Sequence, residues 1–267
     1  MTTSRNKETD GLERTGNWRT NRTARFSGAS IEALFNNEVP AVGIPAFASA
    51  AECDALLTAI SSLAFRNTHF NPASVQRIGP SYFGFKDRKD AYFEAAGRHA
   101  EDWIRLVENT IDPVQRLVAT MAGAGVALRR AYEPGYGHYA PSFIKKRTGS
   151  QLLHTDTAMM MHGWALRENT SQVAWNLYLQ LAQGHDSTTI YDRLEKPGDE
   201  EFTSVCQDYY LEDVVGNADS VTIRPAVGDL IFINSCNYHC VHSSDNDRIT
   251  IGGFLAPAGT GAAIYWA

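Results

Sequence analysis

The feature that most restricts the fold of this chain is a series of short segments, after about residue 126, in which apolar and polar residues alternate. Such alternation is typical of β-strands, because successive side chains point to opposite faces of a sheet. We predict strands at residues 126–132, 151–157, 172–179, 187–191, 220–224, 228–233 and 248–255, after helices at residues 31–35, 49–63, 87–107 and 112–123, with a further helix among the strands at residues 200–215. Ser49 and Glu52 form the pattern of a capping box at the start of the second helix, and Asp112-Pro113 is a typical start for the fourth. Helices followed by many short strands predict a mainly β fold with flanking helices, either a sandwich or a barrel.

Residues 1–28 are rich in Thr, Asn, Arg and Glu and contain few aliphatic side chains. Such a segment buries too little apolar surface to order itself, so we expect a flexible N-terminal tail. We expect residues 29–267 to form a single domain. Within it, residues 40–45 are bounded by prolines and predict an edge strand.

Composition excludes several classes of protein. The net charge of -6 gives no reason to expect nucleic-acid binding, and no apolar run is long enough to span a bilayer. The polar N-terminus lacks the apolar core of a signal peptide, so we expect a cytoplasmic protein. Its four cysteines are then expected to be reduced thiols. A homodimer is a possible oligomeric state.

His154 and Asp156 lie two residues apart in one of the alternating segments. On an extended strand these positions project from the same face, so the imidazole and the carboxylate point the same way. A third ligand is available further along the chain, as His239 or His242. Two histidines and one carboxylate, with other coordination positions open, suit a non-haem ferrous oxygenase.

A zinc site is the alternative at the same place, because Cys236, His239, Cys240 and His242 are close in sequence. Their spacing lacks a second pair of ligands of the kind that structural zinc sites use, and this favours the oxygenase site.

Arg248 and Thr250 follow the histidines on a predicted strand, again two residues apart. The guanidinium can hold a carboxylate with two hydrogen bonds, and the threonine hydroxyl can add another. This is the arrangement that an iron enzyme needs to bind the distal carboxylate of 2-oxoglutarate.

The C-terminal residues that carry a resemblance are VGDLIF at 227–232, Tyr238-His239-x-Val241, Arg248-x-Thr250 with IGGFLA at 251–256, and IYW at 264–266. They resemble the iron- and 2-oxoglutarate-dependent oxygenases of free-standing small molecules. The chain is similar to the carrier-protein-independent aliphatic halogenases of the indole-alkaloid type and to the N-substituted amino-acid hydroxylases. The resemblance covers about the last half of the chain.

The resemblance implies a double-stranded β-helix, also called a jelly roll or cupin-like fold. It implies that His154, Asp156 and His239 hold Fe(II), and that Arg248 and Thr250 bind 2-oxoglutarate. Oxygen and 2-oxoglutarate would be consumed, with ascorbate as the assay reductant. The halogenases have glycine where this chain has Asp156, and this departure predicts hydroxylation.

Five residues are predicted to contact the substrate. Gly79, Tyr82 and Phe83 lie in an aromatic and glycine-rich segment that can cover the iron, while Leu153 and Phe254 are next to motif positions. The basic run at residues 145–147 is either a solvated loop or a device that steers an anionic substrate such as an N-acylated amino acid.

The expected function is hydroxylation of an unactivated C–H bond in a small molecule, foremost an N-substituted amino acid. Two alternatives stay open: an oxygenase that tailors a larger natural product of the alkaloid or nucleoside type, and a non-catalytic cupin that binds metal. The Arg248-x-Thr250 pair favours an enzyme, because a binding module needs no carboxylate clamp beside its metal.

Overall fold

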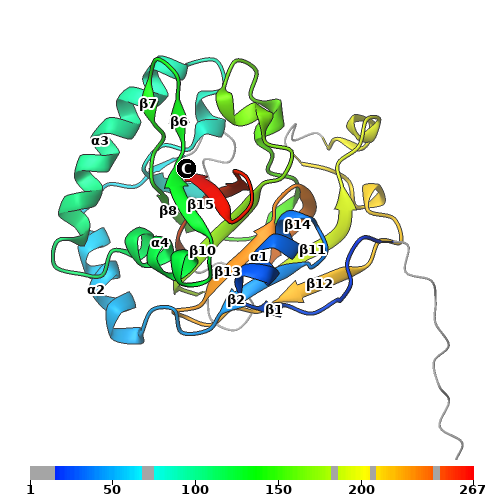
Figure 1. The fold of residues 1–267 in the computed structure, drawn as a ribbon, viewed down its shortest axis with the longest axis horizontal. Coiled ribbons are helices and arrows are strands. Elements are labelled where there is room, and N and C mark those ends of the chain that lie inside the picture. The colour runs from blue at the N-terminus through cyan, green and yellow to red at the C-terminus, as the bar shows by residue number, and fades with distance from the viewer. Residues whose placement is uncertain (1–15, 68–74, 182–185, 205–208, 243–246) are drawn as a thin grey trace, which may run out of the picture.

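The computed structural model describes residues 16–67, 75–181, 186–204, 209–242 and 247–267, and consists of two β-sheets with helices against the larger one (Figure 1). The larger sheet contains β1 (Ala24–Arg25), β2 (Ala41–Ile44), β3 (Arg66–Asn67), β4 (Val75–Ile78), β5 (Ala127–Arg130), β8 (Phe143–Arg147), β10 (Val173–Gln180), β13 (Leu230–Asn234), β15 (Arg248–Pro257) and β16 (Ala262–Trp266). The smaller sheet contains β9 (Gln151–His154), β11 (Ser187–Leu194), β12 (Ser220–Ile223) and β14 (Asn237–His242). A separate hairpin contains β6 (Tyr132–Glu133) and β7 (Gly137–His138).

The two sheets face each other, and the predicted jelly roll with flanking helices is confirmed. Strand β10, in the middle of the larger sheet, shows how the sequence produces these layers. Val173, Trp175 and Leu177 belong to the core between the sheet and the helices. Ala174 and Tyr178 point to the opposite face, toward the smaller sheet. The period of two along the strand therefore assigns alternate residues to the two cores.

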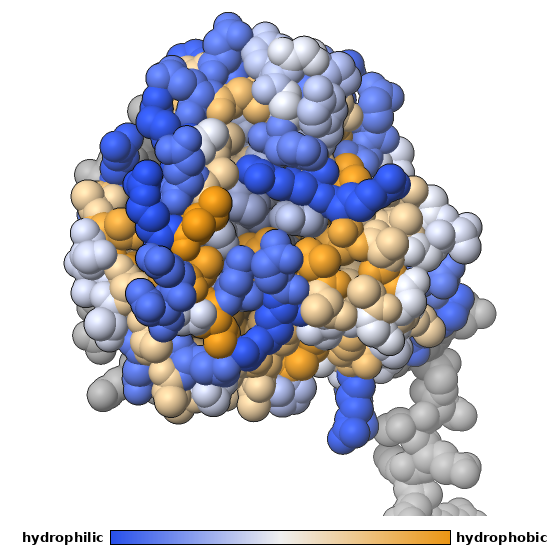
Figure 2. Space-filling model, turned by 60° about the vertical axis from the view of Figure 1, so that its left-hand side comes forward, coloured by the Kyte–Doolittle hydropathy of each residue, from blue (hydrophilic) through white to orange (hydrophobic). Residues whose placement is uncertain are grey.

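Four α-helices cover the outer face of the larger sheet: α1 (Gly28–Phe35), α2 (Ala50–Ser61), α3 (Lys89–Val107) and α4 (Pro113–Gly123). The Ser49 side chain accepts the Glu52 N–H, and Glu52 accepts the Ser49 N–H, which completes the capping box predicted for α2. Asp112 caps α4, with Pro113 in its first turn, as predicted. On the face shown in Figure 2, hydrophilic residues cover much of the surface, with small hydrophobic patches between them.

The structure differs from the expected tail over residues 16–28. The Trp18 side chain is buried, its backbone N–H donates to the Asp192 carboxylate at 2.9 Å, and its indole N–H donates to Asn37 at 3.2 Å. Strand β1 pairs in parallel with β2. One large aromatic side chain and one short strand pairing thus hold this polar segment against the fold. Residues 1–15 lie outside the described residues.

Two other local predictions were wrong. Strand β2 lies between β1 and β13, so it is not the edge strand that its prolines predicted. The helix expected at residues 200–215 is replaced by two short 3₁₀ helices, Asp199–Phe202 and Glu212–Val214, with residues 205–208 outside the described part. No helix in the described ranges is both long and apolar enough to cross a membrane.

Gly252 and Gly253 allow β15 to lie close to its neighbours. A Cβ atom on Gly252 would come within 2.6 Å of the Trp175 carbonyl oxygen on β10, and one on Gly253 within 2.6 Å of the Trp266 carbonyl oxygen on β16. Because real Cβ atoms do not approach backbone so closely, only glycine fits at these positions. On the same strand, Thr250 is the register partner of Tyr178 on β10, and the Arg248 side chain donates a hydrogen bond to the Tyr178 hydroxyl.

Candidate metal centre

Two strands of the smaller sheet bring His154 and His239 together. The two residues are register partners in the β9–β14 ladder, and their ring centroids lie 4.2 Å apart. Asp156 follows β9, where its N–H donates to the Ser235 carbonyl at 2.8 Å. Its Oδ2 lies 3.9 Å from Nε2 of His239, and one ligand atom from each of the three residues lies within 4.8 Å of the others. A single ion can therefore contact all three side chains.

Hydrogen bonds direct the Nε2 atoms of both histidines toward this point. Nδ1 of His154 lies 2.8 Å from the Leu152 carbonyl oxygen, and Nδ1 of His239 lies 2.9 Å from the Asn237 carbonyl oxygen. A carbonyl only accepts, so Nδ1 carries the proton in each ring and Nε2 carries the lone pair. Burial lowers the pKa of His154 to about 3 and also lowers the pKa of His239. Both rings are thus neutral, as metal binding requires.

Asp156 supplies the charge of the group. Burial alone would raise the pKa of its carboxyl, but neighbouring side chains, the cations Lys145 and Arg77 among them, outweigh that effect and hold the pKa below its ordinary value. The carboxylate is therefore ionised. Two neutral imidazoles and one carboxylate, with the remaining coordination positions open toward the cavity, fit a divalent ion of the first transition row such as Fe(II).

His242 does not join this group. It lies three residues after His239 on β14, so it projects from the opposite face, where it is exposed. Its Nε2 lies 3.4 Å from Sγ of Cys240, whereas Sγ of Cys236 lies 3.9 Å from the Gln172 carbonyl. The alternative zinc cluster does not form. Among the described residues, the metal-binding geometry is found only at His154, Asp156 and His239.

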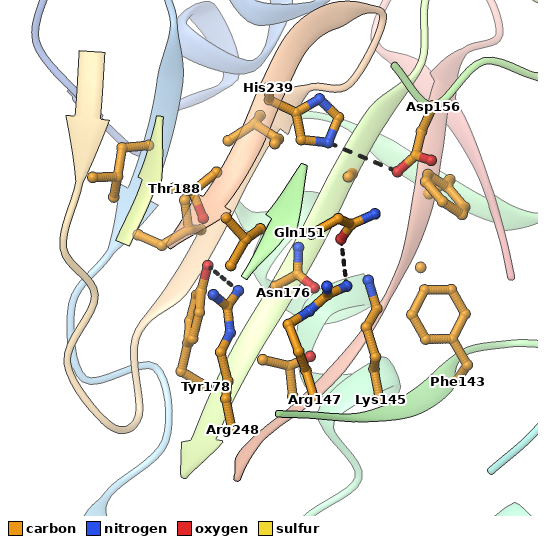
Figure 3. Close-up of a pocket in the computed structure, with 18 of the residues that line it drawn as sticks. Phe143, Lys145, Arg147, Gln151, Asp156, Asn176, Tyr178, Thr188, His239 and Arg248 are labelled. Carbon is orange, nitrogen blue, oxygen red and sulfur yellow. Dashed lines mark hydrogen bonds and ion pairs between the residues drawn. The ribbon is translucent and has the colours of Figure 1, made fainter. Parts of the chain in front are cut away.

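A cavity between the two sheets extends from the metal centre to the Arg248 side chain (Figure 3). Arg248 is buried, and its guanidinium lies over the Tyr178 ring and donates to the Tyr178 hydroxyl at 3.3 Å. Its NH1 atom has no hydrogen-bond partner. Thr250 is also buried and lines the same cavity. The predicted clamp and the predicted ligands therefore face one cavity from opposite sheets.

The cavity also contains cations whose orientation was not predicted. Residues 143–147 form β8 and not a loop, so the alternate residues Phe143, Lys145 and Arg147 line the cavity. Lys146 points the other way and forms an ion pair with Asp247 at 2.6 Å. The period-two signal was present in the sequence, but a run of three basic residues hid it.

The aromatic residues predicted to contact the substrate form one cluster at the cavity wall. Phe254 lines the cavity, and its ring lies 5.6 Å from that of Tyr82 and 5.8 Å from that of Phe83, measured between centroids. The Tyr82 side chain is fully buried, and its hydroxyl donates to Gln172 at 2.9 Å. Tyr82 and Phe83 therefore support Phe254 from behind.

Two other residues that were predicted to contact the substrate, Leu153 and Gly79, lie elsewhere in the structure. Leu153 was expected to line the cavity, but it packs with Val214 and Tyr238 on the opposite side of the smaller sheet. The reason is that neighbours on a strand alternate, so the residue next to His154 points away from the metal. Gly79 lines a second cavity of about 440 Å³, where a Cβ atom on it would come within 2.6 Å of Nε2 of His99.

Gln151 and Asn176 both line the cavity, but neither was predicted as a site residue from the sequence. Gln151 accepts a hydrogen bond from Arg147. The β9–β14 register shifts between the pairs at His239 and Val241, and this irregularity turns Gln151 inward three residues before His154. A strictly alternating strand would not have predicted that orientation.

Comparison with known protein families gives a match over residues 23–267 to the family described as carrier-protein-independent halogenase WelO5. Among curated proteins, the leucinostatins biosynthesis cluster protein S of Purpureocillium lilacinum is 27% identical over 207 residues, which cover 71% of this chain and 84% of that protein. The L-gamma-glutamyl-L-propargylglycine hydroxylase of Streptantibioticus cattleyicolor is 24% identical over 189 residues, which cover 66% of each chain.

Among solved structures, the fold is similar to that of an N-substituted L-amino acid dioxygenase from Burkholderia ambifaria AMMD, solved in complex with alpha-KG. The TM-score is 0.64 at 15% sequence identity, and the match covers 90% of both chains. This likeness, at a low level of identity, supports the jelly-roll fold over the matched part of the chain.

Proposed function

This chain belongs to the family of the carrier-protein-independent halogenase WelO5, and from this membership and its site we propose that it is an Fe(II)- and 2-oxoglutarate-dependent dioxygenase that hydroxylates a small molecule. The observation that carries the proposal is the convergence of His154, Asp156 and His239 on the cavity that also contains Arg248. A metal centre and a carboxylate clamp in one cavity serve a cosubstrate that binds both.

His154, Asp156 and His239 would hold the ferrous ion. When bound, the ion together with 2-oxoglutarate and O₂ supplies oxidation of a C–H bond, with succinate and carbon dioxide as coproducts. The backbone carbonyls of Leu152 and Asn237 fix the planes of the two imidazoles through their Nδ1–H groups. Asp156 offsets part of the charge of the ion.

Arg248 and Thr250 would hold the distal carboxylate of 2-oxoglutarate. The Arg248 guanidinium keeps an unpaired nitrogen for this purpose, while Tyr178 fixes the guanidinium by stacking and by a hydrogen bond. Both side chains are almost completely buried. Hydrogen bonds to a carboxylate are strong in such a water-poor setting, because bulk water does not compete for them.

Hydroxylation is favoured over halogenation by Asp156. By resemblance, the halogenases have glycine at this position, which leaves a coordination position for chloride. Here Oδ2 of the Asp156 carboxylate lies 3.9 Å from Nε2 of His239. The protein therefore offers three side-chain ligands and not two.

We propose an N-substituted amino acid as the substrate class. Support comes from the names of two similar proteins, an N-substituted L-amino acid dioxygenase and a hydroxylase of a gamma-glutamyl amino acid. The second candidate, a larger natural-product scaffold, is supported by the similarity to a protein of the leucinostatins cluster. A cytoplasmic location and a homodimeric state stay predictions from the sequence.

The test is the formation of succinate from 2-oxoglutarate by the purified protein with ferrous iron, ascorbate and O₂. We expect slow turnover without substrate, and faster turnover with a member of a library of N-substituted amino acids. Mass spectrometry should then detect a product that has gained one oxygen atom. A protein that binds iron but never forms succinate would be the non-catalytic cupin, and the proposal would fail.

A further inference from the structure

The cavity is lined by more cationic than anionic side chains. Lys145, Arg147 and Arg248 all line it, and Asp156 is the carboxylate among its lining residues. In Figure 3 the three cationic side chains lie side by side, with their charged ends directed into the cavity below His239 and Asp156. In the described part of the chain, none of the three forms an ion pair with a carboxylate, since the ion pairs found involve other cations.

Lys145 and Arg147 have few partners of their own. The Arg147 side chain is 3% exposed, it donates to the neutral amide of Gln151, and its NH1 atom has no hydrogen-bond partner. Nζ of Lys145 lies 5.4 Å from the centre of the Phe143 ring. Neither contact supplies a negative charge.

Such an arrangement costs stability. Burial and the neighbouring cations lower the pKa of Lys145 well below its ordinary value, and burial followed by Arg248 lowers the pKa of Arg147 to about 9. Unpaired charges of one sign in a water-poor site are unfavourable unless a ligand of the opposite sign binds there. The cavity therefore has the electrostatics of an anion site.

The ligands of the proposed function leave two of these charges unmatched. The ferrous ion and Arg248 together carry three positive charges, and the two carboxylates of 2-oxoglutarate and that of Asp156 carry three negative ones. Lys145 and Arg147 then remain. They are the ladder partners of Thr250 and Arg248, respectively, so they lie directly beside the 2-oxoglutarate clamp.

We propose, resting on the proposed function, that Lys145 and Arg147 form a second anion subsite that binds a carboxylate of the substrate. Phe143 and Phe254 line the cavity next to them and offer an apolar wall. The substrate class that fits both features is an N-acylated amino acid with a free carboxylate and an apolar side chain. The carboxylate binds between Lys145 and Arg147, and the side chain packs against the two phenylalanines.

The test compares acids with their uncharged amides. Protein loaded anaerobically with ferrous ion and 2-oxoglutarate is titrated calorimetrically with N-acetyl-L-leucine and N-acetyl-L-phenylalanine, and with the corresponding amides. At least one acid should bind about tenfold to a hundredfold more tightly than its amide, which is the range expected for a hydrogen-bonded charge pair. This comparison uses the unaltered protein, so it does not depend on the folding of a variant.

Variants then assign the preference to residues. Lys145→Met and Arg147→Met should each reduce the preference for the acid to about threefold or less, with unchanged affinity for 2-oxoglutarate. Lys146→Met is the matched control, because Lys146 is its neighbour on β8 but points away from the cavity toward Asp247. It should keep the full preference.

Three results would overturn the subsite: no acid binds more tightly than its amide, the preference survives both Met variants, or the variants weaken 2-oxoglutarate binding instead. The last result would assign both cations to the cosubstrate. Failure of the proposed function gives a different result, in which acids bind preferentially but no succinate forms under any condition.

Discussion

Replacing Arg248 by glutamine tests the cosubstrate clamp most sharply. The buried guanidinium has no carboxylate partner among the described residues, and one of its nitrogens has no partner at all. Two charge-assisted hydrogen bonds to the distal carboxylate, at about 1.5 kcal/mol each, contribute about 3 kcal/mol to binding. Their loss in Arg248→Gln should raise the Kd for 2-oxoglutarate by roughly a hundredfold.

The assay is an anaerobic titration of 2-oxoglutarate into the iron-loaded protein, followed by calorimetry. Arg248→Lys should give an intermediate Kd, because lysine keeps the charge but loses the planar fork. Arg129→Gln is the control, since Arg129 is exposed on β5. A change of less than about threefold in the Kd of Arg248→Gln would refute the assignment of this residue to the cosubstrate.

Three other predictions concern stability and the choice of reaction. Burial lowers the pKa of His99 from 6.5 to about 4, so the unfolded state binds more protons than the folded state between these pH values. The unfolding free energy should therefore fall as the pH falls from 6.5 to about 4. Urea titrations should show a shallower fall for His99→Gln than for His162→Gln, and equal slopes would contradict the prediction. Phe232→Ala should lower the unfolding free energy by about 3 to 5 kcal/mol because Phe232 is fully buried. Tyr132 is exposed, so Tyr132→Ala should change the unfolding free energy little. Equal losses of unfolding free energy in the two variants, measured by chemical denaturation, would contradict this prediction. Asp156→Gly should abolish or strongly reduce product formation by mass spectrometry, and hydroxylation at the parent rate would show that Asp156 is not a ligand.

Much of the fold follows from local patterns in the sequence. The capping box at Ser49, the Asp112-Pro113 start of α4 and the alternation along β10 depend on neighbours within a few residues, and they were predicted with their boundaries nearly correct. The positions of His154, Asp156 and His239 followed from a period of two and from a family resemblance. These predictions depended on patterns between residues that are near one another in the sequence.

The predictions that differed depend on contacts between distant segments. Trp18 is ordered by Asp192, which is 174 residues away in the sequence, and the composition of the N-terminal segment gives no sign of that contact. The inward turn of Gln151 results from an irregular register with β14. Lys145 was hidden in a basic run until the pairing of β8 with β15 showed which face it occupies.

The central claim is that His154, Asp156 and His239 hold one metal ion, and a metal titration of paired histidine variants tests it most directly. Anaerobic titration of ferrous ion into the wild-type protein should give one tight site per chain. His239→Ala should lose that site, and His242→Ala, three residues away and exposed, should keep it. Tight binding that survives in His239→Ala, or that is lost in His242→Ala, would contradict the account.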